Sequence, residues 1–272
     1  MNVVLSTLNS KFIHSSLALR YLKAYGQAHG QAYDIVEYTI NMPVLHILGD
    51  ITERNIDVLG FACYIWNIEM TLHIVDMVKA VRPDIKIILG GPEVSFTADE
   101  ILNRCAAVDY VVQGEGEEAF YQLISALIAG KDGLEEQIPG VRGRHISGRL
   151  LGSTDTVEVK DLSTIPFPYV EEDMIDLEHK IIYYESSRGC PFSCQYCLSG
   201  NKNTVRFFPQ ERTFKELQWF IDHKVKQVKF VDRTFNCAPK NHRPLMEFMR
   251  DADTETNFHL EMEPELMTKW ET

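Results

Sequence analysis

The sequence predicts an α/β protein built in two successive parts. Apolar runs of strand length alternate with helical stripes over roughly the first 130 residues, and the alternation resumes near residue 180. Between Gly130 and Tyr169 this periodicity disappears, and glycine and proline become frequent. We therefore expect an α/β domain over 1–130, a hairpin and linker over 131–179, and a second α/β domain over 180–272.

The first part predicts a mostly parallel sheet covered by helices. Its apolar runs of strand length are 3–8, 33–38, 58–65, 86–89 and 109–112. Its helical stripes are 17–25, 70–81, a short segment that Thr97 opens with Glu100 in capping-box spacing, and 120–128. Five strands with helical crossovers are typical of a flavodoxin-like (Rossmann-type) fold, which binds ligands at the carboxyl ends of its strands.

The second part predicts the first turns of a TIM-like barrel. Strand patterns at 180–186, 227–231 and 258–262 alternate with helical patterns at 214–221 and 244–250, and 267–272 again resembles a helix. A full barrel takes about 250 residues, so only the first three or so β/α units fit. We therefore expect a truncated barrel, and a chain that is inactive alone.

Composition limits the function classes. The net charge of −12 disfavours broad binding to nucleic acid, which needs lysine and arginine to neutralise phosphates. No apolar run reaches the length of a membrane span, and the N-terminus lacks the pattern of a secretory signal. These features predict a cytoplasmic protein without a membrane partner. Three of the six cysteines fall within eight residues, which indicates a metal centre instead of disulfides.

Cys190, Cys194 and Cys197 form that cluster, directly after a predicted strand. Thiolates at this spacing select zinc or iron–sulfur. A structural zinc site needs a fourth ligand, and the sequence offers only single residues such as Cys237 and His223, without a second Cys-x-x-Cys pair. Three thiolates on a [4Fe–4S] cluster instead leave one iron open to a small molecule. Zinc remains the alternative.

The segment Cys-x-x-x-Cys-x-Tyr-Cys, preceded by Ser187-Arg188-Gly189, resembles the radical S-adenosylmethionine (SAM) superfamily. The resemblance implies a [4Fe–4S] cluster on the three cysteines, whose open iron chelates SAM and whose electron cleaves it to methionine and a 5′-deoxyadenosyl radical. It also implies an electron donor such as flavodoxin or ferredoxin. Tyr196 would touch the adenine, and Asp232 and Glu261, at predicted strand ends, would hold the rest of SAM.

The order of the whole chain resembles the cobalamin-binding-domain radical SAM proteins, and within them the subgroup with an extra C-terminal domain of unassigned role. The matching segments are Tyr64-Ile-Trp66-Asn67, Gly90-Gly91-Pro92-Glu93, Gly114-Glu115-Gly116-Glu117 and the Pro-Phe-Pro linker. The resemblance implies cobalamin as a methyl carrier, and we expect its contacts among Tyr64, Trp66, Gly90, Gly91, Glu93 and Gly114. The glycines also suit plain tight turns.

The loop after the first strand departs from many cobalamin modules. They carry Asp-x-His-x-x-Gly there, with the histidine on cobalt, whereas this loop has His14 without the aspartate or the glycine. This puts cobalt ligation by His14 in doubt. Gly114-x-Gly116-x-x-Ala119 imitates a dinucleotide fingerprint, but it follows the fifth strand and carries glutamates that would repel a pyrophosphate.

The leading functional hypothesis is a cobalamin-dependent radical SAM methyltransferase. The alternatives are a radical SAM enzyme of non-methylating type and a non-catalytic cobalamin- or metal-binding sensor. The sequence does not reveal the substrate, small molecule or otherwise, or the catalytic residues.

Overall fold

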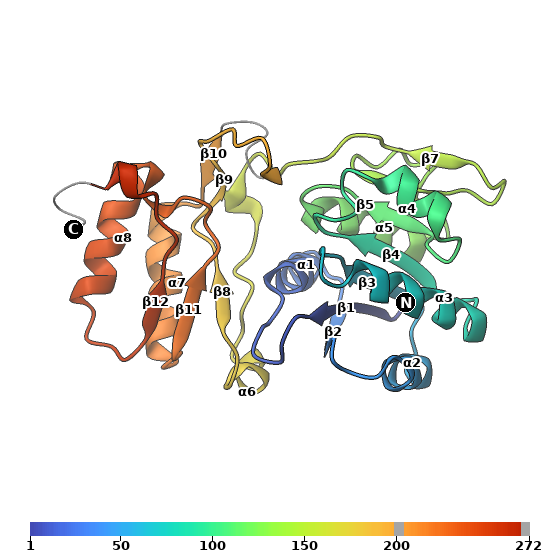
Figure 1. Ribbon diagram of the computed structural model, residues 1–272, viewed down its shortest axis with the longest axis horizontal. Helices are drawn as coiled ribbons and strands as arrows, with labels where there is room; N and C mark the ends of the chain where they lie inside the picture. Colours follow the sequence, from blue (N-terminus) through green and yellow to red (C-terminus); the bar gives the residue numbers. More distant parts are fainter. Residues whose placement is uncertain (199–203, 268–272) are drawn as a thin grey trace. The chain divides into compact units, whose positions relative to one another are not determined.

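The structure is a computed structural model that describes residues 1–198 and 204–267. It divides into two compact units, Met1–Val159 with Ile165–Tyr169 and Lys160–Thr164 with Val170–Thr272. Figure 1 shows the elements of both units along the chain. No helix of the described residues is long and apolar enough to cross a membrane.

The first unit is a seven-stranded sheet in the order β2-β1-β3-β4-β5-β6-β7. The first five strands are parallel, and the last two run antiparallel to their neighbours. The strands are β1 Val3–Asn9, β2 Tyr33–Thr39, β3 Val58–Ala62, β4 Lys86–Gly90, β5 Tyr110–Val112, β6 Val141–Arg144 and β7 Leu150–Gly152. The α/β class and the flavodoxin-like strand order are thus confirmed.

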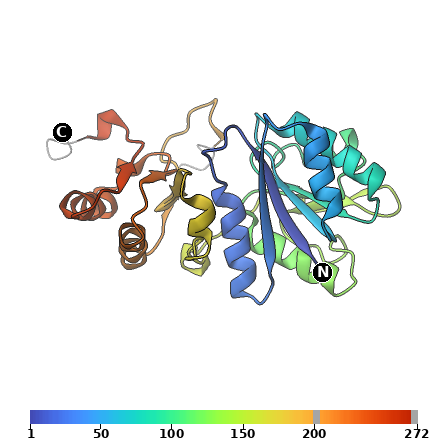
Figure 2. The same ribbon diagram turned by 90° about the horizontal axis from the view of Figure 1, so that it is seen from below.

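Helices cover both faces of this sheet, because its central strands are buried on both sides. Its helices are α1 Leu17–Ala28, α2 Val44–Glu53, α3 Ile68–Val81, α4 Ala98–Arg104 and α5 Gly116–Ile128. Helices α2, α3 and α4 pack on one apolar cluster, and α1 and α5 on the other. In Figure 2 the blue α1 and the green α5 lie on one side of the strands, with α2 and α3 on the opposite side.

Two local details differ from the sequence predictions. Strand β3 ends at Ala62, three residues earlier than predicted, so Cys63 lies in the following loop. The expected capping box at α4 is wrong, because the Thr97 hydroxyl donates to the Glu93 carbonyl oxygen and does not cap the helix. Within residues 131–179, β6 and β7 form an antiparallel hairpin, as predicted, and this hairpin extends the sheet of the first unit.

The second unit contains a parallel three-stranded sheet in the order β12-β11-β8, the arrangement that begins a β/α barrel. An antiparallel pair, β9 with β10, flanks the cysteine segment. The strands are β8 Ile182–Tyr184, β9 Ser187–Gly189, β10 Val205–Phe207, β11 Gln227–Phe230 and β12 Asn257–His259. The helices are η1 Leu162–Thr164, α6 Asp173–Leu177, α7 Gln210–Asp222, η3 Phe235–Cys237, α8 Pro239–Asp251 and η4 Pro264–Leu266. The helix predicted at 267–272 lies almost wholly outside the described residues.

Candidate functional site

The first candidate site is the carboxyl edge of the parallel sheet in the first unit. The strand order reverses between β1 and β3, since β2 lies on one side of β1 and β3–β5 follow on the other. Open α/β sheets bind ligands outside this reversal point. The loops that follow β1, β3, β4 and β5 all begin at this edge.

Asn67 joins the ends of β1 and β3 at the reversal point. Its side chain is 1% exposed, and its Nδ2 lies 3.1 Å from the Leu8 carbonyl oxygen and 3.2 Å from the Ala62 carbonyl oxygen. Its Oδ1 accepts from the Tyr64 amide at 2.8 Å. The amide side chain therefore replaces backbone partners where the ladder between the two strands stops. Our sequence prediction did not include Asn67, although it belongs to one of the matching segments.

Tyr64 and Trp66 lie together in the loop after β3. Their rings stack with centroids 4.6 Å apart and planes inclined by 3°. The Trp66 Nε1 donates to the Leu8 carbonyl oxygen at 3.2 Å, while the side chain remains 48% exposed. This pair provides a flat aromatic surface fixed to the end of β1.

The same edge carries several exposed apolar side chains from three loops. Two come from the β1 loop, two from the β3 loop and one from the β4 loop: Phe12, Ile13, Ile65, Trp66 and Phe96. Large apolar side chains exposed in neighbouring loops are typical of a ligand surface. We call these five residues the apolar rim.

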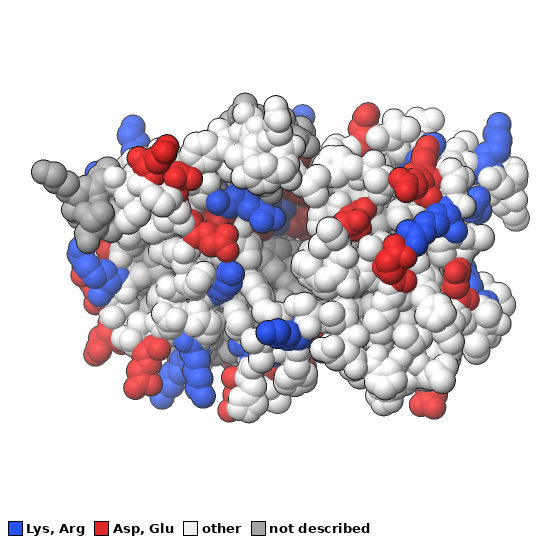
Figure 3. Space-filling model, viewed as in Figure 1, with Lys and Arg blue, Asp and Glu red and all other residues white. Residues whose placement is uncertain are grey.

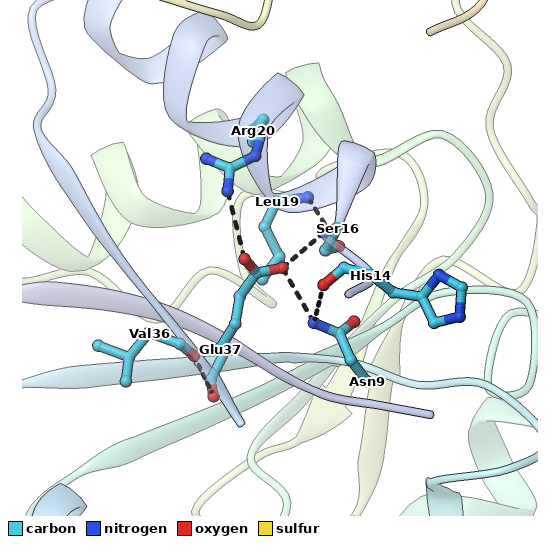
Figure 4. Close-up of polar contacts among 8 residues, drawn as sticks. Asn9, His14, Ser16, Leu19, Arg20, Val36 and Glu37 are labelled. Carbon is cyan, nitrogen blue, oxygen red and sulfur yellow. Dashed lines mark hydrogen bonds and ion pairs between the residues drawn. The ribbon is translucent and has the colours of Figure 1, made fainter. Parts of the chain in front are cut away.

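Buried polar contacts hold the β1 loop in place (Figure 4). Glu37, on β2, accepts from the Ser16 amide and from Asn9 Nδ2 at 3.2 Å with one carboxylate oxygen. Its other oxygen pairs with Arg20 Nη2 at 3.2 Å, and both side chains are 6% exposed. Asn9 Nδ2 also donates to the His14 carbonyl oxygen at 3.0 Å. The imidazole of His14 points away from Glu37 in Figure 4, so the histidine contributes its backbone to this cluster.

In the glycine-rich segments predicted to contact cobalamin, two glycines leave room for another part of the backbone to approach closely. A Cβ on Gly91 would lie 2.6 Å from the Cys63 carbonyl oxygen, and one on Gly114 would lie 2.2 Å from that of Val157. Gly114 also has φ +85°, which only glycine adopts readily. Gly90 has no such close neighbour, and Glu93 is half-buried beside Cys63. Contact of these four residues with cobalamin stays a prediction.

Ser95 links the β4 and β5 loops at this edge. Its Oγ donates to the Gly91 carbonyl oxygen at 2.8 Å and accepts from the Gly114 amide at 3.0 Å. Glu115 then binds the Val159 amide through its carboxylate at 2.6 Å. The Gly114-Glu115 turn therefore fixes the chain where it leaves the first unit.

The second candidate site is the cysteine segment after β9. Cys190 is buried, Cys197 is half-buried, and Cys194 is exposed, with a hydrogen bond from the Cys197 amide to the Cys194 carbonyl oxygen at 3.0 Å. Tyr196 is 93% exposed. Three thiols within eight residues suit an iron–sulfur cluster by donor type. Within 1–198 and 204–267, no group of three His, Cys, Asp or Glu side chains is arranged to hold a metal ion.

Asp232 holds the segment that leads into the cysteines. It follows β11 and is 1% exposed, and its carboxylate accepts from the Ser186 amide at 2.9 Å and from the hydroxyls of Ser186 and Ser187. Burial raises the pKa of its carboxyl group, and the hydrogen bonds from the two serines act in the opposite direction. The carboxylate therefore faces the polypeptide, and a contact with SAM stays a prediction.

Glu261 and Cys237 lie near this segment without joining the cysteines. Glu261 lies beyond the end of β12, not within a strand as predicted, and pairs with Lys229 at 3.3 Å while 51% exposed. Burial raises the pKa of the Cys237 thiol, and the nearby Asp232 carboxylate raises it further.

The surface charge is mixed on the face drawn in Figure 3. Lysine and arginine side chains there are interspersed with acidic ones and form no continuous basic surface.

Comparisons with known proteins bear on the family of this chain. A family model for the B12-binding domain matches residues 3–124. The chain is 31% identical over 196 residues to 2-(S-pantetheinyl)-carbapenam-3-carboxylate methyltransferase of Streptantibioticus cattleyicolor, covering 68% of this chain and 28% of the relative. It is 29% identical to the cobalamin-dependent radical SAM methyltransferase TokK of Streptomyces tokunonensis, covering 77% of this chain and 32% of TokK.

Among solved structures, OxsB aligns with 99% of this chain and has a TM-score of 0.77 at 16% identity. That structure is described as a cobalamin-dependent SAM radical enzyme with aqua-cobalamin and SAM bound, and the match covers 41% of it. Residues 3–124 thus match the B12-binding domain, and the chain as a whole is similar to cobalamin-dependent radical SAM enzymes. It spans about a third of the length of the two curated relatives. Its membership of the subgroup with an extra C-terminal domain stays a prediction.

Proposed function

We propose that this chain carries the cobalamin-binding and cluster-binding parts of a cobalamin-dependent radical SAM methyltransferase. The observation that supports this most strongly is the combination of a B12-binding module over 3–124 with three thiols in the loop after β9. Neither feature alone would distinguish such an enzyme from a cobalamin sensor or a zinc protein. The substrate and the reductant lie outside this inference.

Each unit has a separate task in this proposal. In the first unit, the apolar rim and the Tyr64–Trp66 pair would cover the corrin, and the β4 and β5 loops would follow its tail. In the second unit, Cys190, Cys194 and Cys197 would hold the cluster, while Asp232 positions the strand that leads to them. When bound, the cluster supplies the electron that cleaves SAM, and cobalamin carries the methyl group.

Anaerobic reconstitution tests the proposal directly. The protein is loaded with iron and sulfide, with and without hydroxocobalamin, and followed by absorption and EPR spectroscopy. We expect a reducible [4Fe–4S] signal that SAM shifts, together with a retained corrin band and formation of methionine and 5′-deoxyadenosine under reduction. Methyl transfer to a substrate would separate a methyltransferase from an enzyme of non-methylating type.

Cysteine variants provide the control. The triple variant Cys190→Ala, Cys194→Ala, Cys197→Ala should bind at least tenfold less iron and sulfide than the unsubstituted protein. Cys105→Ser should keep it, because that buried thiol donates to Asp76 in the first unit. Stoichiometric zinc without a cluster signal would overturn the proposal, and a cluster without retained corrin would remove cobalamin from it.

A second prediction concerns the apolar rim. The double substitution Phe12→Ser, Ile65→Ser should weaken retention of hydroxocobalamin by about tenfold or more, since burying each side chain against a ligand is worth about 1.5 kcal/mol. Both side chains are largely exposed, at 69% and 79%, so the fold should persist. Equilibrium dialysis followed by the corrin absorption measures the effect. Ile128→Ala, at the end of α5 and 54% exposed, is the matched control, and an equal loss there would refute this placement.

A further inference from the structure

The hydroxyl of Thr234 lies beside one of the three cysteine sulfurs. The distance between Thr234 Oγ1 and Cys190 Sγ is 3.6 Å, and both residues are buried, at 7% and 9% exposed. Thr234 belongs to the loop that follows β11, whereas Cys190 follows β9. The contact thus joins two segments that are 44 residues apart.

Iron binding would fix the direction of this hydrogen bond. In the free thiol either atom can donate, but a thiolate that binds iron has no proton. The Thr234 hydroxyl must then be the donor. Hydrogen bonds to the ligand sulfurs are one of the means by which proteins set cluster potentials, because they stabilise the more negatively charged reduced state.

The backbone around Thr234 is held on both sides. The Phe235 amide donates to the Glu261 carbonyl oxygen at 2.9 Å, and the Cys237 amide donates to the Thr234 carbonyl oxygen at 3.2 Å. Asn236 exchanges two hydrogen bonds of 2.9 Å with the backbone of Glu263. A β-branched side chain on such a backbone has few rotamers, so the hydroxyl stays directed at the sulfur.

We propose that Thr234 raises the reduction potential of the cluster through a hydrogen bond to the sulfur of Cys190. The inference rests on the proposed function, since it assumes a [4Fe–4S] cluster on the cysteines. One electron from a mediator dye takes the cluster from the 2+ to the 1+ state, and no bond forms or breaks. Thr234 acts through Cys190 and needs no contact with SAM.

Potentiometric titration monitored by EPR tests the proposal on the reconstituted protein. Thr234→Val keeps the shape and removes the hydroxyl, so reduction should become several-fold to tenfold less favourable. A tenfold change corresponds to about 59 mV for one electron, towards more negative potential. Thr234→Ser keeps the donor and should remain close to the original potential.

Thr256→Val is the matched control, because the buried Thr256 hydroxyl has no hydrogen-bond partner among the described residues and precedes β12. The reduction potential of the cluster in this variant should equal that of the unsubstituted protein. If the unsubstituted protein assembles the cluster and Thr234→Val titrates at the same potential, the inference is wrong while the proposed function stands. If the unsubstituted protein assembles no cluster, both fail.

Thr234→Ala is a second hydroxyl-free variant, in case valine disturbs the loop. A shift in both hydroxyl-free variants supports the hydrogen bond. Failure of both to assemble a cluster that Thr234→Ser assembles would assign Thr234 to holding the cluster and overturn its role in setting the potential.

Discussion

Glu37→Gln should lower the free energy of opening of the first unit by about 3–5 kcal/mol, the usual cost of removing one partner of a buried ion pair. Glu37 and Arg20 are both 6% exposed, and the same carboxylate also binds the Ser16 amide and Asn9. The variant leaves a buried guanidinium facing a neutral amide. Native-state hydrogen exchange of the β1 and β2 amides measures the loss, since their opening reports on this unit separately.

An exposed ion pair of the same unit, Glu69 with Arg104, gives the control. Glu69 and Arg104 are 71% and 49% exposed, and surface ion pairs contribute little to stability because solvent screens them. Glu69→Gln should therefore leave exchange in β1 and β2 nearly unchanged. Similar losses for Glu37→Gln and Glu69→Gln would show that the Glu37 cluster does not support the loop.

Asp232→Ala should destabilise the second unit by about 2–4 kcal/mol and reduce cluster loading. Three hydrogen bonds from Ser186 and Ser187 end on this carboxylate, and each bond to a charged group is worth about 1.5–3 kcal/mol. The cost of burying the carboxylate offsets part of that sum, as its raised pKa indicates. Hydrogen exchange in β8 and β11, together with iron content after reconstitution, measures both effects.

Asp251→Ala is the corresponding control, because Asp251 is 65% exposed and pairs only with the adjacent Arg250 among the contacts described. It should leave the stability of the second unit nearly unchanged, because surface substitutions away from buried contacts have small effects. Full cluster loading by Asp232→Ala at unchanged β8 protection would contradict the positioning role.

The larger architecture was predictable because buried parallel strands are continuous apolar runs. Residues 58–62 and 86–90 show this pattern, and the helices between such runs have clear stripes. The carboxyl-end rule predicted the edge of the sheet where a ligand would bind, and the family resemblance pointed to Tyr64, Trp66 and the glycine-rich segments there. The cysteine spacing predicted the second site without any knowledge of the fold.

The features that the sequence did not predict are short strands and polar residues whose partners lie far away along the chain. Strands β9 and β10 have only three residues each and include glycine or arginine, so they carry no clear alternation. Glu37 resembles the solvent-facing position of a strand, and only its distant partner Arg20 makes its burial favourable. Asn67 and Ser95 act through backbone groups of other loops, which spacing along the chain does not reveal.

The bonds that Asn67 and Glu37 make have a thermodynamic consequence for ligand entry. They order the loops after β1 and β3 before any ligand arrives, so binding need not bear the entropy of organising them. Calorimetry of hydroxocobalamin binding should then show a heat-capacity change that reflects only the apolar surface covered, without the larger change of coupled folding. A preorganised edge of this kind lets weak apolar contacts, such as those of the rim, appear almost fully in the affinity.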